Sequence, residues 1–192
     1  NARGYGGSYL QFNTRNGIRC NTRMAYLDAA QGRPNLTIRT GAMVNRVLIN
    51  ASRATGVKAT IDGIEGEFTA RKEVILCGGA FNSPQLLELS GIGRRDVLAN
   101  AGIPLVHELP MVGENLSEHV YSPTMFRASP EVSWNQSLSN PLGKAKLGLR
   151  WLTHRDGPLS SVTITAQAFA PSRPDGTDAE LKIQVQQVSS PG

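Results

Sequence analysis

The sequence predicts an α/β fold, α+β overall, in which a partial doubly wound domain with a β-meander precedes part of an antiparallel-sheet domain. Two observations predict the first domain: a strand, glycine turn and helix pattern over residues 74–91, and a series of short alternating segments before it. A third, the alternating run Leu181–Gln186, predicts a strand with one solvated face in the second domain. We expect the first domain to cover residues 1–119 and the second to cover residues 120–192.

Composition argues against several classes of function. The chain has 192 residues, of which 40% are hydrophobic and 18% charged, as is usual for a globular core. The net charge is +5, but the basic residues are scattered, so we interpret them as solvated surface and expect no nucleic-acid partner. No apolar run approaches the roughly 18 residues of a membrane span. With two cysteines and no Cys/His cluster, we expect no metal site.

The residues before the glycine turn predict one helix among short strands. An alternating piece at Tyr9–Phe12 indicates a strand, and Asn16-Gly17 indicates a turn. Asn21-Thr22 can cap a helix that continues to Ala30. Four short strands then follow, the last three at hairpin spacing, and together they predict the meander: residues 35–40, 43–49, 56–61 and 66–70.

The glycine turn itself follows an apolar run, Val74–Leu76, that predicts a buried strand, with Cys77 as a core residue. Ser83 suits a helix N-cap and Pro84 the first helical position, and Gly91 suits the end of the helix. In open α/β sheets this arrangement places free N–H groups and the positive end of a helix where nucleotide cofactors bind. A turn of small residues can equally serve close packing alone.

Beyond the turn, the pattern predicts a helix over residues 94–101, an apolar connector, and a helix over residues 140–152 with Leu142, Ala145, Leu149 and Leu152 on one apolar face. Glu114, Glu118 and His119 could form an acid/base set, but a histidine beside a glutamate is more often a structural pair.

Three motifs resemble the glucose-methanol-choline (GMC) oxidoreductases. The string A-x-N-S-P-Q-L-L-x-L-S-G-I-G, from Ala80 to Gly93, is similar to the second signature of that family. The segment P-N-L-T-I-R-T-G-A-x-V, from Pro34 to Val44, also matches. Residues 109–119 resemble the pattern L-P-G-V-G-x-N-L-x-D-H, with Met111 in place of glycine and Glu118 in place of aspartate.

The resemblance implies FAD as cofactor and a division into the latter part of an FAD-binding domain and the first part of a substrate-binding domain. In the family, the residue that matches Val44 contacts the adenine of FAD through its backbone. The cofactor-binding residues that we expect in this chain are Val44, Gly78, Gly79, Ala80 and Asn115. We assign no catalytic residue, because the family's catalytic histidine is expected beyond Gly192. The G-x-G-x-x-G phosphate motif is also absent from these residues, so we expect the chain alone to be inactive.

The resemblance also implies a reaction: oxidation of a small-molecule alcohol to an aldehyde or ketone, with hydride passing to the flavin. The electron acceptor, whether oxygen, a quinone or a dye, stays open. One alternative is a GMC-type hydroxynitrile lyase, which keeps FAD without net redox chemistry, and another is a non-catalytic basic binding module. A flavin disulfide reductase is disfavoured, because the chain has no closely spaced cysteine pair.

Overall fold

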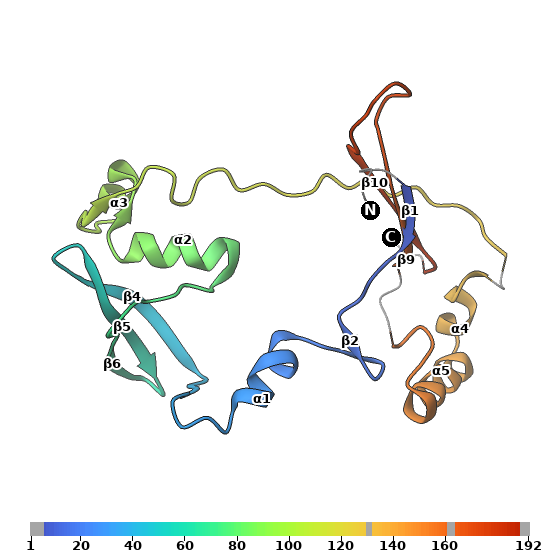
Figure 1. Ribbon diagram of the computed structural model, residues 1–192, viewed down its shortest axis with the longest axis horizontal. Helices are drawn as coiled ribbons and strands as arrows, with labels where there is room; N and C mark the ends of the chain where they lie inside the picture. The colour runs from blue at the N-terminus through green and yellow to red at the C-terminus, as the bar shows by residue number, and fades with distance from the viewer. Residues whose placement is uncertain (1–5, 130–131, 161–163, 189–192) are drawn as a thin grey trace. The chain divides into compact units, whose positions relative to one another are not determined.

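The computed structural model describes residues 6–129, 132–160 and 164–188 (Figure 1). The chain divides into two compact units, one formed by residues 37–121 and the other by residues 1–36 together with 122–192. Both contain helices and strands, so the predicted mixed class is confirmed. The assignment of residues 1–119 and 120–192 to cofactor and substrate domains stays a prediction.

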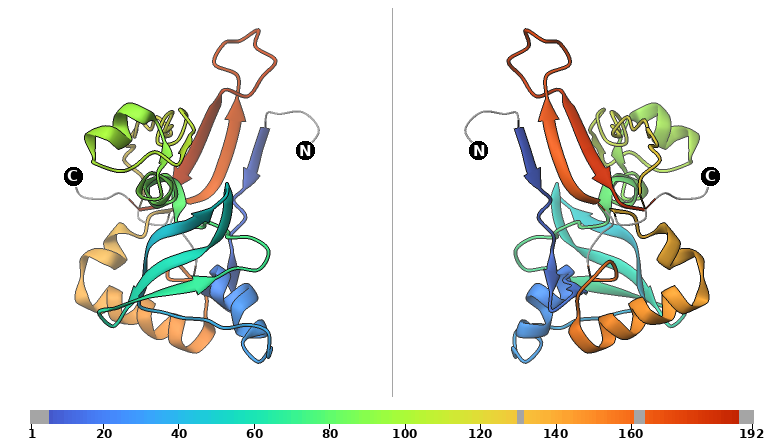
Figure 2. Two further views of the ribbon diagram at one scale, coloured as in Figure 1. Left: turned by 90° about the vertical axis from the view of Figure 1, so that its left-hand side faces the viewer. Right: turned by 90° about the vertical axis from the view of Figure 1, so that its right-hand side faces the viewer.

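An antiparallel meander is the main feature of the unit 37–121. Strands β4 (Ala42–Asn50), β5 (Arg53–Ile61) and β6 (Ile64–Thr69) lie in that order in one sheet (Figure 2). The turn between β5 and β6 has Asp62 at φ 51° and Gly63 at φ 79°, and two such residues match the twist of a tight hairpin. The three strands predicted at hairpin spacing are therefore confirmed.

Two other predicted strands are wrong. Residues 35–40 and 74–76 have no strand structure, and Ile75 is 73% exposed. Cys77, expected in the core, is exposed as well. An apolar run becomes a buried strand only when neighbouring strands pair with it on each side. Among the described residues the meander sheet ends at β4 and β6, so neither segment has a partner strand.

Helix α2 (Gly79–Leu89) follows the glycine turn, but it begins earlier than predicted. Gly78 occupies the N-cap position and Pro84 lies inside the helix, so the expectation that Ser83 and Pro84 open it is wrong. Instead, the Ser83 hydroxyl accepts the backbone N–H of Gly78 at 3.0 Å. Proline is tolerated throughout the first turn of a helix. A proline in the sequence therefore locates the first residue of a helix only to within about a turn.

The C-terminal end of α2 leads into a small parallel pair and a short helix. Gly91 has φ 81° and follows the last turn, as predicted. Strand β7 (Ile92–Gly93) pairs in parallel with β8 (His107–Glu108), and α3 (Arg95–Asn100) lies between them in sequence. Leu98 on α3 is only 1% exposed, so it is the most deeply buried large side chain described in this unit.

Ser90 connects α2 to strand β4 of the meander through a hydrogen bond. Its hydroxyl accepts the backbone N–H of Val47 on β4 at 2.8 Å and donates to the carbonyl of Leu86 at 2.5 Å. Ser90 and Val47 are each 7% exposed, so the bond lies out of contact with most solvent. A buried N–H that loses its acceptor retains its desolvation cost, which makes this one bond important for the packing of α2 on β4.

We therefore expect Ser90→Ala to lower the free energy of unfolding by about 1–3 kcal/mol, because it leaves the Val47 N–H without an acceptor. Urea unfolding measures the change. Ser139→Ala is the matched control, since the hydroxyl of this exposed serine donates only to the Gln136 carbonyl in its own helix. Equal, small losses in the two variants would contradict the role of Ser90.

The second unit contains an antiparallel sheet in the order β1-β9-β10, formed by β1 (Gly6–Tyr9), β9 (Ile164–Ala170) and β10 (Leu181–Gln186). The strand predicted at residues 181–186 is confirmed, whereas the one predicted at Tyr9–Phe12 ends at Tyr9. Every residue of β10 is exposed, so the predicted contrast between a wet and a buried face is not observed.

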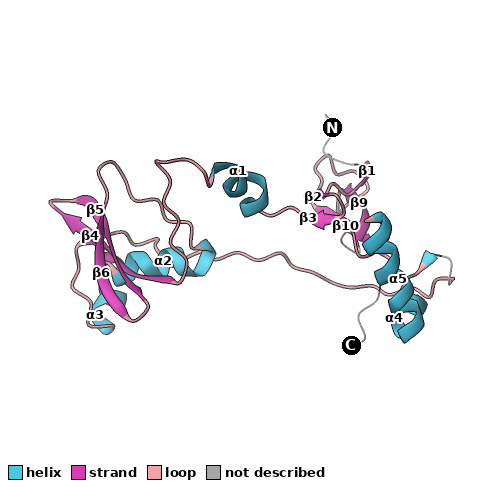
Figure 3. Cartoon of the chain, turned by 90° about the horizontal axis from the view of Figure 1, so that it is seen from below, coloured by secondary structure: helices cyan, strands magenta, loops and turns pink. Residues whose placement is uncertain are grey.

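Two asparagines of this unit, Asn21 and Asn140, accept backbone N–H groups at the beginning of helical segments. The Asn21 side chain accepts the Met24 N–H at 3.0 Å, as predicted, although residues Arg23–Leu27 (η1) form a π-helix that continues into α1 (Asp28–Ala30). The second pair of helices is α4 (Asn135–Ser139) and α5 (Pro141–His154), shown in cyan in Figure 3. None of the helices in the described part of the chain is long and apolar enough to cross a membrane.

Helix α5 buries a different side from the predicted one. Leu147 is 7% exposed, whereas Leu142, Leu149 and Leu152 are 81%, 63% and 62% exposed. The helix is amphipathic as expected, but the described residues leave its apolar stripe uncovered.

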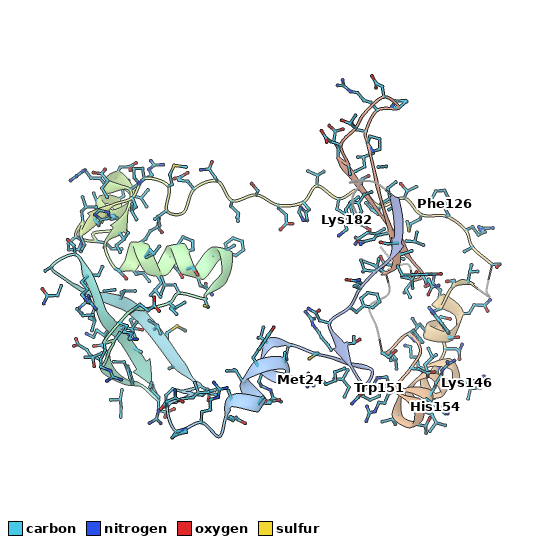
Figure 4. All side chains as sticks on the ribbon, viewed as in Figure 1. Met24, Phe126, Lys146, Trp151, His154 and Lys182 are labelled. Carbon is cyan, nitrogen blue, oxygen red and sulfur yellow. The ribbon has the colours of Figure 1, made fainter. Side chains whose placement is uncertain are left out.

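A short hairpin is attached to the C-terminal end of α5. Strands β2 (Thr14–Arg15) and β3 (Ile18–Arg19) enclose the predicted turn at Asn16-Gly17. The Trp151 indole on α5, labelled in Figure 4, donates to the Gly17 carbonyl at 2.9 Å. The Arg155 guanidinium lies 4.1 Å from the centre of the Trp151 ring. Trp151 thus connects the hairpin to the helix.

Candidate functional site

The N-terminal end of α2 is an open turn of small residues. Gly78, Gly79 and Ala80 are all exposed, and Gly79 has φ 81°. Apart from the adjoining backbone of its own helix, a Cβ atom built on Gly79 would meet nothing within 4 Å, so a ligand can approach this backbone directly. The N–H groups in the first turn of a helix lack intrahelical acceptors and lie at its positive end. The turn can therefore receive hydrogen-bond acceptors of a nucleotide.

Val44 lies on β4, the strand against which α2 packs. It is half-buried, pairs with Ala59 of β5, and adjoins a register shift between Val44 and Arg46. Because β4 is at the edge of the described sheet, one row of its backbone N–H and C=O groups faces away from β5. Val47 uses one N–H of that row to bind Ser90. An edge of this kind can offer both a donor and an acceptor to a planar base.

Asn115 lies toward the other end of α2. It is exposed, with φ 57°, in the irregular segment that follows β8. Gly113, two residues before Asn115, lies close to Glu88 of α2. A Cβ atom built on Gly113 would be 3.0 Å from the Glu88 Oε1 atom. An 11-residue helix is about 16 Å long, so α2 separates Asn115 from the glycine turn. The predicted residues thus lie in two places along α2, with Val44 on the strand beside it.

The acid/base set that was considered and disfavoured for Glu114, Glu118 and His119 is not assembled. Glu114 pairs with Arg94, and the Glu118 carboxylate accepts the backbone N–H of His119 at 2.8 Å. Within the described segment, neither carboxylate hydrogen-bonds to the His119 ring. No group of three or more metal-ligating side chains occurs in the described ranges either.

Arg94 is the polar residue that sequence reasoning did not single out. Its guanidinium binds both oxygens of Asp96, at 3.1 and 2.5 Å, and one oxygen of Glu114, at 2.8 Å. Hydrogen bonding to Asp96, then to Glu114, raises the pKa of Arg94, and the same bonds to Arg94 lower the pKa of Asp96. The pair of Arg94 and Asp96 could have been recognised from their spacing at the beginning of a helix. The bond to Glu114 could not, because Glu114 is 20 residues away in the sequence.

Comparison with known proteins now decides the family. A family model described as GMC oxidoreductase matches residues 2–121, which is more than half of the chain. The chain belongs to the GMC oxidoreductase family. The resemblance noted in the sequence motifs is thereby confirmed.

Characterised GMC proteins are similar over most of this chain. The oxygen-dependent choline dehydrogenase of Escherichia coli K12 is 42% identical, in a match that covers 83% of this chain and 29% of that protein. A formate oxidase variant from Aspergillus oryzae, studied for FAD modification, is 26% identical with a TM-score of 0.70, covering 81% of this chain and 27% of that one. Pyridoxine 4-oxidase from Mesorbium loti is 36% identical with a TM-score of 0.53, covering 56% and 21%.

These GMC relatives are much longer than the region of similarity. The chain spans less than a third of the choline dehydrogenase and of both solved structures.

Proposed function

We propose that this chain provides part of the FAD site of an oxidoreductase that acts on the CH–OH group of a small alcohol. The observation that carries the proposal is the open turn at Gly78–Ala80, beside an edge strand that bears Val44, in a chain of the GMC family. Similarity to a choline dehydrogenase, a formate oxidase and a pyridoxine 4-oxidase supports the oxidoreductase class.

The residues fit FAD by their geometry. Gly79 combines a positive φ with empty space at its Cβ position, as a backbone that contacts a cofactor requires. We assign to Gly79 and Ala80 backbone hydrogen bonds to the nucleotide, and to Gly78, whose N–H already donates to the Ser83 hydroxyl, a close approach to it. We assign to Val44 a backbone contact with the adenine. Asn115, near the far end of α2, is assigned to another part of the same elongated cofactor.

When bound, FAD supplies the acceptor for the hydride that leaves the alcohol carbon. The residues described here bind and orient that group. We assign none of them as the base that takes the hydroxyl proton, because Glu114 is paired with Arg94 and Glu118 is occupied by a backbone N–H. The choline, formate and pyridoxine named for the relatives provide a first set of compounds to test.

Anaerobic mixing of the flavin-loaded full-length protein that contains this chain with choline or pyridoxine tests the proposed reaction. We expect the visible absorbance of oxidised flavin to be lost with at least one alcohol, in proportion to the aldehyde formed. Flavin that stays oxidised with every alcohol while the protein cleaves a cyanohydrin would instead favour the lyase. A protein that retains no FAD and binds heparin through moderate salt would favour the basic binding module.

A further inference from the structure

The segment that carries Asn115 has little backbone structure of its own. The Leu109 N–H bonds to the Gly93 carbonyl at 3.1 Å, and Glu114 N–H bonds to Met111 at 3.3 Å. Residues 115–121, all of them described, form no further backbone–backbone hydrogen bond. Gly113 and Asn115 have φ of 81° and 57° on either side of Glu114. The conformation at Asn115 therefore depends on side-chain contacts.

Arg94 makes such a contact from a firmly held position. It stands at the N-cap of α3, directly after β7, and α3 is anchored by the deeply buried Leu98. Asp96 binds two nitrogens of the guanidinium and fixes its plane. The remaining nitrogen, Nη1, is thereby directed at Glu114 Oε1, 2.8 Å away.

We propose that Arg94 is a positioning residue that acts through Glu114 to hold Asn115 in its cofactor-binding conformation. This rests on the proposed function, because Asn115 is a cofactor contact only if FAD binds here. Glu114 occupies a variable position of the V-G-x-N-L pattern, so the pair with Arg94 is not contained in the family resemblance. If the pair is lost, the segment samples other conformations, and the apparent affinity for FAD falls with the fraction that stays competent.

Two neutral variants separate positioning from simple charge attraction. FAD is an anion, so removal of a nearby positive charge weakens binding and removal of a negative charge strengthens it, if long-range electrostatics dominates. If the pair positions Asn115, removal of either charge weakens FAD binding. We expect Arg94→Gln and Glu114→Gln each to weaken FAD binding about two- to fivefold, the range of an exposed ion pair. The double variant should be no weaker than either single one.

Arg95→Gln is the matched control. Arg95 is the next residue and forms an ion pair with Glu108 at 2.8 Å, but Glu108 lies in β8, before the irregular segment. FAD titration of the full-length protein, followed by flavin fluorescence, gives the dissociation constant, and a thermal melt without FAD reports global stability. We expect Arg95→Gln to bind FAD like the wild type, and all the variants to melt within a few degrees of it.

Each remaining outcome has a distinct meaning. A wild-type full-length protein that binds no FAD overturns the proposed function itself. A wild type that binds FAD, with Glu114→Gln binding equally well or more tightly, overturns the positioning role alone. So does an Arg95→Gln variant that loses as much affinity as Arg94→Gln, because the effect would then be one of total charge.

Discussion

Gly91→Ala is expected to unfold the unit of residues 37–121 or to leave it only marginally stable. Gly91 has φ 81°, and a Cβ atom there would lie 2.5 Å from the carbonyl oxygen of Pro104 and 2.7 Å from a methyl group of Val106. The positive φ costs an alanine about 1–2 kcal/mol. Relief of the overlap requires backbone movement, which adds about 1–3 kcal/mol or more. The sum is a large share of the roughly 5–15 kcal/mol that stabilises a domain.

Gly102→Ala in the same unit isolates the clash from the backbone strain. Gly102 has φ 68°, but a Cβ there would meet nothing within 4 Å. We expect a loss of about 1–2 kcal/mol from φ alone. Urea unfolding followed by circular dichroism measures both variants. Equal losses at Gly91 and Gly102 would show that the contact of Gly91 with residues 104–106 does not constrain the fold.

Gly17→Ala is expected to have the second large effect, in the other unit. A Cβ atom on Gly17 would lie 2.1 Å from the carbonyl oxygen of Arg155, and φ at Gly17 is 66°. The substitution therefore pushes the β2–β3 turn away from α5 and breaks the bond from the Trp151 indole to the Gly17 carbonyl. We expect a loss of about 3 kcal/mol or more from strain and overlap together.

Tryptophan fluorescence follows this change, because Trp151 then loses its hydrogen bond and becomes more exposed. Gly157→Ala is the control: its φ is 80°, but the nearest atom to its Cβ position is Arg150 Nε at an ordinary 3.5 Å. The account is contradicted if Gly17→Ala retains the wild-type emission spectrum and unfolds no earlier than Gly157→Ala.

Local patterns in the sequence predicted the elements that depend on local chemistry. The hairpins at residues 16–17 and 62–63, the cap at Asn21 and the end of α2 at Gly91 each rest on a preference for positive φ or on a short side-chain bond. Such preferences act within a few residues of the position they govern. They were therefore readable without knowledge of the rest of the fold.

Elements that depend on distant partners were predicted less well. Val74–Leu76 has the composition of a buried strand, yet no described strand pairs with it. The stripe of Leu142, Leu149 and Leu152 was identified correctly as apolar, but it is exposed. A pattern shows which side of an element is apolar, and it does not show whether the covering residues belong to the same chain. This chain spans only 29% of the length of its choline dehydrogenase relative.

In the candidate site, too, features that depend on local sequence were predicted and a feature that depends on a distant partner was not. The small residues at Gly78–Ala80 and the strand with Val44 were found from sequence, because a glycine turn before a helix and an alternating strand are local signals. The pair of Arg94 and Glu114 was not found, because it joins residues 20 positions apart through a guanidinium whose orientation is fixed by Asp96.

The central claim is that FAD contacts this chain through the backbone of Val44 and of the turn at Gly78–Ala80. Amide hydrogen exchange of the full-length protein that contains this chain, with and without FAD, tests it most directly. The account predicts slower exchange on FAD binding at residue 44 and over residues 78–82, with little change over residues 181–186 of β10. FAD that binds without slowing exchange at residues 44 and 78–82 would contradict the account.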